Sequence, residues 1–330
     1  MLLIISENND PSTDDVIDYL SYLKTLSLRI NNNSTTQLTL LENDDICDFT
    51  LEYEGNKVKL SAIESYWYRR TDLMYNNKTL WGNLSQNSVQ DRLLRQNIFQ
   101  QVSEEWRGVN EYFANLLKQK NGLGSVLERK TSKLWHQYLA KQIGFKIPAT
   151  LVTSLKKDLI KFKETYPELI TKRIQNTLHF QVEGHYFGLL TQPVTPELID
   201  ELPKKFFPTM FQERVEKLYE LRVFYLAGEC YAMAIFSQLD EQTKLDFRHY
   251  NDEKPNRFVP YNLTSKEKLQ IDQFMKLNNL DTGSLDFMVD RDKNMVFLEV
   301  NPEGQLGMVS IPCNYYLEEK IAKFLINKDG

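Results

Sequence analysis

Two acidic side chains and one amide are spaced so that they could bind a cation together. Asp286 lies in the apolar segment 283–289, and Glu299 lies in the apolar segment 295–300. Asn301 follows two residues after Glu299. A short charged stretch separates the two segments, and this pattern predicts a β-hairpin with one acid on each strand. Because side chains alternate between the faces of a strand, Asn301 shares the face of Glu299.

The register of this hairpin follows from the length of its loop. We expect residues 291–294 to form the loop, which makes Asp290 face Met295. Counting back along both strands then puts Asp286 opposite Glu299, about 5 Å away at Cβ. The other face then carries an apolar stripe of Leu285, Phe287, Val289, Val296, Leu298 and Val300.

Two carboxylates and an amide oxygen on one face form a hard-oxygen cluster of the kind that holds Mg²⁺ against nucleotide phosphates. The competing interpretation is a hairpin whose polar face is simply solvated. Opposed acids repel each other unless a cation lies between them, and polar faces more often carry lysine, threonine or mixed charge. The pattern therefore favours a metal site at Asp286, Glu299 and Asn301.

Length and composition restrict the class of protein. The chain has 330 residues and a mass of 38.9 kDa, enough for two or three packed domains, and 42% of its residues are hydrophobic. Its net charge of −5 and its pI near 5.6 argue against a general nucleic-acid binder. No apolar run approaches the length that crosses a bilayer. We expect a soluble protein that binds neither nucleic acid nor membrane.

Cysteine usage points to a reducing compartment. The three cysteines are far apart and form no CxxC pair, so they offer neither a zinc site nor a disulfide framework. They are Cys47, Cys230 and Cys313. Residues 1–5 are too short for the apolar core of a signal peptide, and the chain turns polar at Ser6. We expect a cytoplasmic protein.

Hydrophobic periodicity and turn signals predict the order of the elements. In the first third we expect a buried strand at 1–6, a helix at 13–24, short strands between 28 and 70, a long helix at 88–118 and a boundary at 122–124. Beyond it we expect a helix at 131–143 closed by Gly144, a helix at 156–164 and a strand at 169–172. The last part should be rich in strands from 208 to 301, with one helix at 265–277, and should end in a helix at 315–326.

Four motifs in this order resemble those of ATP-grasp ligases. Residues 211–215 resemble the nucleotide hinge, and residues 220–223 resemble the acidic, apolar and arginine motif that follows it. Residues 246–248 (Asp-Phe-Arg) resemble the later Asp-x-Arg signature. The hairpin of Asp286 and Glu299 resembles the metal motif, whose usual form is an Asp followed by Leu-Glu-Val-Asn-Pro-x-Gly. The combination is much more specific than any one motif.

Within that superfamily the whole chain resembles the maturases of graspetides, which are ribosomally made peptides crosslinked by side-chain esters or amides. This subgroup includes the grasp-with-spasm and microviridin-type macrocyclases. The matching segments are the Leu-Ile-Ile-Ser of residues 3–6, the Trp-Tyr-Arg-Arg run at 67–70, residues 144–150 and residues 301–305.

The resemblance implies an α/β (α+β) ATP-grasp fold in three parts. Residues 1–122 would form an N-terminal pre-ATP-grasp α/β domain, and residues 123–207 a central α+β subdomain. Residues 208–330 would form the C-terminal antiparallel-sheet subdomain that holds the Mg-ATP site.

The resemblance also implies where the nucleoside of ATP binds. The hinge from Gln212 to Val215 would offer its backbone edge to adenine, with Glu213 as the matching position. Glu220 would accept hydrogen bonds from the ribose hydroxyls.

Two lysines would contact the phosphates. Lys172, at the end of an apolar strand, is one of them. Lys133 is the other, in a register that Arg129 and Lys130 leave open. A lone lysine is usually a solvated surface charge, so only its position relative to the motifs singles out Lys172. Many ATP-grasp ligases have a glycine-rich loop after this lysine, whereas residues 173–183 contain no glycine.

Arg222 and Arg248 would balance charge on the γ-phosphate and on an acyl phosphate, because an arginine fork suits planar anions. For Arg222, an ion pair with Glu220 or a neighbouring acid is a serious competing role. Asp286, Glu299 and Asn301 would hold Mg²⁺ that bridges the phosphates.

The implied reaction activates a substrate carboxylate. An Asp or Glu of a precursor peptide attacks the γ-phosphate, and a Thr or Ser hydroxyl or a Lys amine of the same peptide then displaces phosphate. The expected cofactors are ATP and Mg²⁺. The expected partner is a precursor peptide with a leader and an acidic, Thr-rich core, and the protein is a possible homodimer. Two other functions remain open: a ligase that adds an amino acid to a protein or small molecule, and a nucleotide-binding protein without turnover.

The Trp-Tyr-Arg-Arg run at 67–70 has two possible roles. It could contact an acidic peptide, or it could close an interface between the first and middle domains. We favour the structural role, with Trp67 and Tyr68 as buried anchors.

Overall fold

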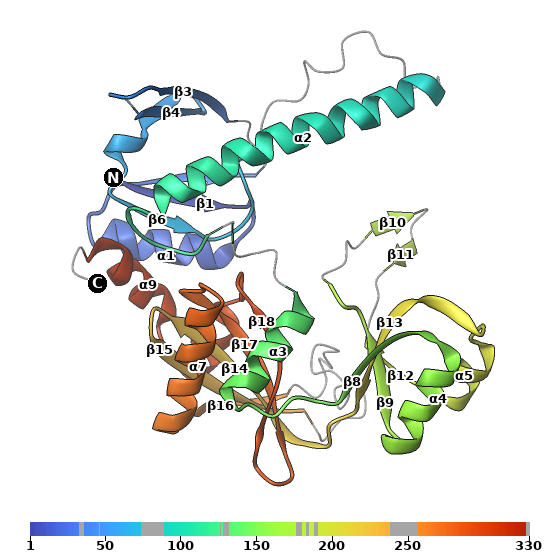
Figure 1. The fold of residues 1–330 in the computed structure, drawn as a ribbon. Helices are drawn as coiled ribbons and strands as arrows, with labels where there is room; N and C mark the ends of the chain where they lie inside the picture. Colours follow the sequence, from blue (N-terminus) through green and yellow to red (C-terminus); the bar gives the residue numbers. More distant parts are fainter. Residues whose placement is uncertain are drawn as a thin grey trace. The chain divides into compact units, whose positions relative to one another are not determined.

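The computed structural model describes residues 1–32, 36–45, 47–73, 89–125, 127, 132–175, 180–182, 185–187, 191–237 and 256–327 (Figure 1). The chain divides into two compact units. Unit 1 contains Met1–Lys130, Gln305–Ser310 and Tyr316–Gly330, and unit 2 contains Thr131–Gly304 and Ile311–Tyr315. The helix α8 (Gly307–Cys313) has residues in both units.

Unit 1 is built on a parallel sheet whose strand order is β2-β1-β6-β7. Its central strand is the apolar run at the start of the chain, and all its residues are buried, as expected for a strand covered on both faces. The elements of this sheet and its helices are β1 (Leu2–Ser6), α1 (Pro11–Tyr22), β2 (Ser27–Asn31), β6 (Ser65–Tyr68), α2 (Val89–Leu117), β7 (Asn121–Leu123) and α9 (Leu317–Ile326).

An antiparallel sheet in the order β3-β4-β5 completes unit 1. Its elements are β3 (Gln37–Glu42), β4 (Cys47–Tyr53), β5 (Asn56–Lys59) and the short 3₁₀ helix η1 (Leu60–Ala62). A hairpin turn joins β4 to β5, and Glu54 and Gly55 in this turn both have positive φ. This sheet and the end of α2 share one core with β1 and β6, made of residues that include Leu3, Ile5, Phe49, Tyr68 and Phe113. Trp67 and Tyr68 are buried, as predicted, and their role at an interface between domains stays a prediction.

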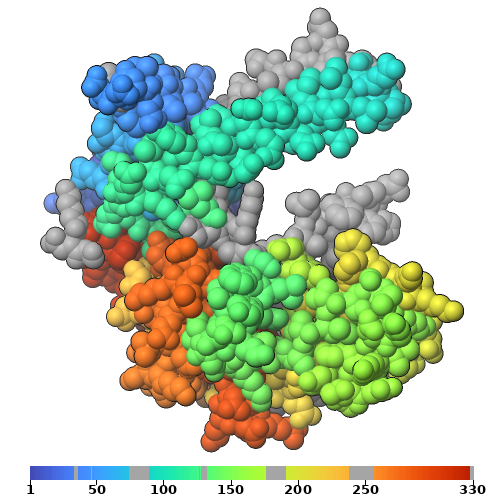
Figure 2. Space-filling view, in the orientation of Figure 1, coloured from blue at the N-terminus to red at the C-terminus, as the bar shows by residue number. Residues whose placement is uncertain are grey.

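The long helix α2 is covered only at its C-terminal end. Its buried residues all lie between Asn110 and Leu117. Figure 2 shows its first half extending away from the described strands of unit 1. Exposed side chains in this half include Leu93 and Phe99. Among the residues that the structure describes, no helix is long and apolar enough to cross a membrane.

A four-stranded sheet in the order β12-β9-β13-β8 forms the first part of unit 2. Its apolar face packs against two helices through residues such as Leu159, Leu169 and Phe211. The elements are β8 (Thr150–Leu155), α4 (Lys156–Thr165), β9 (Leu169–Lys172), β12 (Gln192–Pro193), α5 (Pro196–Glu201) and β13 (Lys205–Glu213), with a separate hairpin of β10 (Phe180–Val182) and β11 (His185–Phe187). The predicted boundary between residues 207 and 208 lies within β13, and the three-domain division stays a prediction.

A five-stranded antiparallel sheet in the order β16-β15-β14-β17-β18 forms the second part. Its elements are β14 (Lys217–Leu226), β15 (Glu229–Phe236), β16 (Arg257–Tyr261), α7 (Ser265–Leu277), β17 (Thr282–Asp290) and β18 (Met295–Asn301). The helices α3 (Lys133–Ile143) and α7 lie against one face, where residues such as Ala140, Phe274, Leu221 and Phe287 form a single core (Figure 1).

Local sequence signals fix both of these helices. The predicted helix at 265–277 begins with a capping box, because Thr264 and Glu267 bond each other's backbone N–H groups. For α3, the Ser132 hydroxyl accepts a hydrogen bond from the Trp135 N–H, and Gly144 ends the helix with a φ of 94°. These two caps set the helix so that Lys133 is its first residue.

The β17–β18 hairpin has the predicted pairing at its acids and a different turn. Asp286 pairs with Glu299, as predicted, but Met295 pairs with Val289 rather than with Asp290. The Asp290 N–H donates to the Asn294 carbonyl, so the loop is residues 291–293. The Asp290 side chain also accepts from the N–H of Asn294, which ties the turn to this shorter loop.

A β-bulge compensates for the shorter loop. The register shifts between Asp286 and Phe287, which leaves Leu298 as an extra residue on β18. The apolar stripe that the sequence predicted to face the core is therefore correct on β17 and at Val300. It is wrong at Val296 and Leu298. Their places in the core are taken by Met295 and Phe297, because a slip of one residue moves side chains to the opposite face.

Candidate functional site

Charged residues lie directly opposite one another across three neighbouring strands. Arg222 on β14 pairs with Asp286 on β17, and Asp286 pairs with Glu299 on β18. We call these three residues the charged row. Arg222 Nε is 3.8 Å from Asp286 Oδ1, and only 8% of the Arg222 side chain and 16% of the Asp286 side chain are exposed. The row lies on the sheet face opposite the apolar core, since Leu221 and Phe287 belong to that core.

Lys133 extends the charged row beyond β18. Its Nζ is 2.8 Å from Glu299 Oε2, and 17% of its side chain is exposed. As the first residue of α3, it also brings the positive end of that helix close to Glu299. Cations therefore flank the two acids on both sides, which relieves the repulsion that opposed carboxylates would otherwise suffer.

Asn301 ends the polar face on β18, opposite Ser284. Its side-chain oxygen accepts a hydrogen bond of 3.0 Å from the Glu303 N–H, and its carbonyl accepts one of 3.1 Å from the Gly304 N–H. A Cβ on Gly304 would lie 2.7 Å from the backbone nitrogen of Ser284. The turn after Asn301 is thus pressed against β17, and only glycine fits there without a shift.

A second polar group is buried beside the charged row. The Lys217 ammonium is 2.5 Å from Glu220 Oε1, and the Ser237 hydroxyl donates to the same oxygen at 3.0 Å. Burial raises the pKa of Glu220, while Lys217 and Ser237 act in the opposite direction. Arg222 pairs with Asp286 and not with Glu220. The competing role expected for Arg222, an ion pair with Glu220 or a neighbouring acid, is therefore observed in its second form, with Asp286 as the acid.

His136 is buried on α3, one turn after Lys133. It is 1% exposed, and neither ring nitrogen has a hydrogen-bond partner among the described residues. Burial lowers the pKa of His136 to about 4, and the nearby charge of Glu299 acts weakly against that shift. The imidazole is therefore neutral at physiological pH and packs edge-on against Phe274.

The donors in this region suit Mg²⁺ that arrives with phosphates. Asp286 and Glu299 offer carboxylate oxygens from adjacent strands, and Asn301 offers an amide oxygen. Among the described residues, no group of three or more His, Cys, Asp or Glu side chains gathers around one point. Mg²⁺ in nucleotide sites is typically held by one or two carboxylates together with substrate phosphates and water, so the residues present fit that ion.

Comparisons with known proteins identify the fold. No protein-family model matches the chain, and no curated protein matches it. Among solved structures, it matches a Chryseobacterium gregarium RiPP-associated ATP-grasp ligase in complex with ADP and a leader and core peptide. The TM-score is 0.82 and the identity 24%, over 100% of this chain and 97% of that one.

Two further solved structures, the macrocyclase MdnC and the ATP-grasp ligase PsnB, match over nearly their whole length. MdnC from Microcystis aeruginosa MRC, bound with precursor peptide MdnA, gives a TM-score of 0.79 at 23% identity, over 99% of each chain. The ATP-grasp ligase PsnB, complexed with a phosphomimetic variant of minimal precursor, Mg and ADP, gives 0.71 at 14% identity, over 100% of this chain and 98% of that one.

This chain has the ATP-grasp fold. The mixed α/β architecture and the C-terminal antiparallel sheet that the sequence predicts are thereby confirmed. A fold supports many chemistries, so the activity has to be argued from the residues of the site.

The predicted hinge lies at the end of β13 and in the connection to β14. The Glu213 carboxylate accepts from the Ala149 N–H at 3.0 Å, and the Glu213 N–H donates to the Ala149 carbonyl at 2.9 Å. The Arg214 N–H is bonded to the Glu168 carbonyl. No described residue accepts a hydrogen bond from the N–H of Val215.

Two predicted residues lie on the sheet before the hinge. Gln212 is buried on β13 and donates to the Thr150 hydroxyl at 2.8 Å. Lys172 pairs with Met210, and Gln212 pairs with Ile170, so these four residues share the face opposite Phe211. Lys172 and Gln212 therefore point to the same side of this sheet. Arg248, Arg129 and Lys130 lie outside the described residues.

Sequence reasoning missed Lys217 and the buried state of His136. A lysine three positions before Glu220 in a strand should point to the opposite face. The register shift between Lys217 and Tyr219 brings it back to the face of Glu220. No sequence signal marks that bulge. For His136, its place on the inner face of a predicted helix was the available signal.

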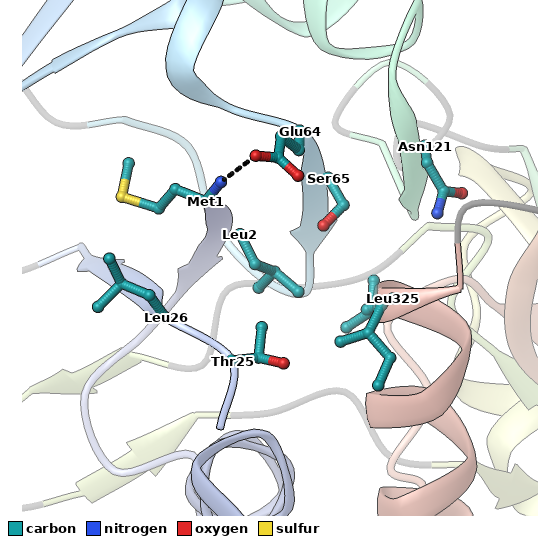
Figure 3. Close-up of a pocket in the computed structure, with 9 residues that line it drawn as sticks. Met1, Leu2, Thr25, Leu26, Glu64, Ser65, Asn121 and Leu325 are labelled. Carbon is teal, nitrogen blue, oxygen red and sulfur yellow. Dashed lines mark ion pairs between the residues drawn. The ribbon is translucent and has the colours of Figure 1, made fainter. Parts of the chain in front are cut away.

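A separate pocket in unit 1 has a volume of about 340 Å³ (Figure 3). It lies where β1, β6 and β7 begin, and its lining includes Leu2, Ser65, Asn121 and Leu325. The Met1 ammonium and Glu64 form an ion pair of 3.3 Å there. In parallel α/β sheets ligands bind at the opposite, carboxyl ends of the strands, so this pocket does not have the position of a functional site.

Proposed function

We propose that this chain is an ATP-dependent, ADP-forming ligase that crosslinks side chains of a ribosomally made precursor peptide. The observation that carries the proposal is the charged row with Lys133 at its end. It combines oxygen donors for Mg²⁺ with an arginine and a lysine for phosphate on one face of an ATP-grasp sheet. Phosphoryl transfer needs that combination, because charge neutralisation and positioning supply most of the catalysis.

ATP would bind across the hinge. The Val215 N–H is available to adenine, Gln212 and Glu213 hold the hinge strand in place, and Glu220 accepts from the ribose. Lys172 and Lys133 would contact phosphate oxygens. Arg222, whose guanidinium forms no short hydrogen bond within the described part of the chain, would face the γ-phosphate together with Arg248.

Asp286, Glu299 and Asn301 would hold the Mg²⁺. When bound, the ion neutralises phosphate charge and fixes the geometry of the phosphates. Lys133 on Glu299 and Arg222 on Asp286 are close enough to keep both acids oriented. Those two cations would then turn towards phosphate oxygens as the nucleotide binds.

The reaction has two steps. A substrate Asp or Glu carboxylate oxygen attacks the γ-phosphorus, the bond to the β-phosphate oxygen breaks, and ADP leaves with an acyl phosphate formed. A Thr or Ser hydroxyl, or a Lys amine, of the same peptide then attacks the acyl carbon, loses its proton and displaces inorganic phosphate. The product is an ester or amide ring with one water fewer than the linear peptide.

A peptide substrate is supported by what the similar structures contain. The Chryseobacterium gregarium ligase was solved with a leader and core peptide, and MdnC was solved with its precursor peptide. We extend this to the present chain and propose a partner with a leader and an acidic, Thr-rich core. We also propose a cytoplasmic location, which three unpaired cysteines support, and a possible homodimer, which light scattering on the purified chain tests.

Mass spectrometry tests the proposed function. The purified chain is incubated with ATP, Mg²⁺ and candidate precursor peptides rich in Thr or Ser and in Asp or Glu. Loss of one water per ring, matched by ADP release, is the expected result. A mass gain equal to an added amino acid would instead show a ligase of the glutamate-adding type. Nucleotide binding without ADP release for any acidic peptide would contradict an enzymatic role.

A further inference from the structure

Lys217 is a buried cation to which the proposed function gives no role. Its ammonium is 2.5 Å from Glu220 Oε1, and only 3% of its side chain is exposed. Glu220 is 6% exposed, and Ser237 is 1% exposed. A buried charge is costly unless it is paired, and retaining one beside a proposed ribose acceptor calls for a physical reason.

A bulge in β14 puts Lys217 in that place. Lys217 pairs with Asp290 and Tyr219 pairs with Val289, so Leu218 is an extra residue on β14. Leu218 is 41% exposed and contributes nothing to the core. The irregularity therefore has one structural effect on this face, which is to turn the Lys217 ammonium towards the Glu220 carboxylate.

The two hydrogen bonds to Glu220 are arranged asymmetrically. Lys217 and Ser237 both bond Oε1, and no described residue donates to Oε2. The carboxylate is thus held at one oxygen and open at the other. Burial alone favours the protonated acid, whose pKa it raises, and the charge of Asp286 on β17 acts in the same direction. Lys217 is the nearby cation that opposes both.

We propose that Lys217 is a positioning residue that fixes the Glu220 carboxylate as an acceptor for a ribose hydroxyl and so makes the site select ribonucleotides over deoxyribonucleotides. The inference rests on the proposed function, because it assumes a nucleotide at Glu220. An ionised carboxylate with one oxygen anchored binds a hydroxyl more strongly than a neutral carboxylic acid does. A deoxy sugar lacks that hydroxyl and leaves the second oxygen of Glu220 buried without a hydrogen bond.

Calorimetric titration tests this without a precursor peptide. Wild type is titrated with ADP, 2′-deoxyADP and 3′-deoxyADP in the presence of Mg²⁺. Wild type should bind ADP about tenfold more tightly than the weaker of the two deoxy analogues, the size of one hydrogen bond to a charged group. Lys217→Met, which keeps the apolar stem, should bind ADP about tenfold more weakly and lose most of that preference.

Two further variants make the test specific. Lys217→Gln keeps a donor near Glu220 and removes the charge, so it should also lose most of the preference. Lys146→Met removes a different lysine of unit 2, which pairs with Asp290 at 2.6 Å and is 53% exposed. This control should keep the wild-type affinity and preference.

The outcomes separate this inference from the proposed function. A Lys217→Met or Lys217→Gln protein that is folded and keeps the wild-type preference overturns the inference. Failure of both variants to fold also overturns it, because the ion pair is then only structural. If wild type binds no ADP, or if Glu220→Gln keeps the full preference, the nucleotide assignment itself is wrong.

Discussion

Arg222 on β14 lies directly opposite Asp286 on β17, with 3.8 Å between Arg222 Nε and Asp286 Oδ1. The two charges are close enough to attract each other and too far apart for a hydrogen bond at that nitrogen. Only 8% of the Arg222 side chain is exposed, so little water competes for the N–H donors of its guanidinium. Arg222 Nε has no hydrogen-bond partner among the described residues, which supports the proposal that this guanidinium binds the oxygens of a ligand.

Replacing Arg222 by Lys should slow the reaction strongly. The ammonium keeps the charge and loses the planar fork that binds two phosphate oxygens at once. We expect ADP release to fall by roughly 100-fold or more. Arg291→Lys is the matched control, because Arg291 lies on the same hairpin, is 74% exposed and pairs with Glu216. Equal rates for the two variants would remove Arg222 from the phosphate site.

Neutralising either acid of the charged row should abolish the chemistry and leave the fold intact. Asp286→Asn and Glu299→Gln keep the shape of each side chain and remove a carboxylate that Mg²⁺ requires. We expect the rate of ATP-dependent dehydration of the peptide to fall at least 100-fold, as measured by mass spectrometry. Asp292→Asn, in the turn of the same hairpin, should keep the wild-type rate. Full turnover in Asp286→Asn would refute the metal assignment.

Gly304 should not tolerate a side chain. A Cβ there would lie 2.7 Å from the Ser284 backbone nitrogen, so Gly304→Ala must push the turn away from β17 and displace Asn301. We expect a loss of about 1–3 kcal/mol in the free energy of unfolding, measured in urea, and weaker binding of Mg-ADP.

Gly108 provides the control for that substitution. It lies within α2, and a Cβ there meets no atom within 4 Å. Gly108→Ala should raise the free energy of unfolding by about 0.5–1 kcal/mol, because alanine favours a helix over glycine. If Gly304→Ala behaved like Gly108→Ala, the close packing of the 301–304 turn would be disproved.

His136 should make the fold less stable as the pH falls. The pKa of His136 is lowered to about 4 in the folded chain, against about 6.5 when unfolded. Between these values the unfolded state binds more protons, so stability is full above pH 6.5 and is lost as the pH drops towards 4. We expect about 2 kcal/mol less stability at pH 5 than at pH 7 from this group.

Urea unfolding at several pH values checks the histidine. The free energy of unfolding of wild type should fall between pH 7 and pH 5. Glutamine does not titrate in this range, so this fall should be about 2 kcal/mol smaller in His136→Gln. An unchanged pH dependence in His136→Gln would mean that the imidazole is already protonated, or solvated, in the folded chain.

The sequence was sufficient for the elements that have strong local signals. The apolar start of the chain, the helix after Thr264 and the end of α3 at Gly144 all follow from burial patterns and caps. The cross-strand pair of Asp286 and Glu299 was also predicted, although by a count from the wrong turn. Its success depended on a bulge that the count did not include.

The remaining features depend on contacts that no local pattern encodes. The turn at 291–293 is selected by the Asp290 side chain, and a four-residue loop was equally compatible with the sequence. Lys217 reaches Glu220 only because of a second bulge, whose extra residue has no special chemistry. The pairing of Lys133 with Glu299 joins residues far apart in the chain and requires the packing of α3 beside β18.

The extra residue Leu298 has a practical consequence. It lies between the turn and Glu299, so the tip of the hairpin and the pair of Asp286 and Glu299 are not held in one uninterrupted register. We therefore expect that a tag or a fluorophore at the tip, residues 291–293, leaves the pairing of Asp286 with Glu299 in place.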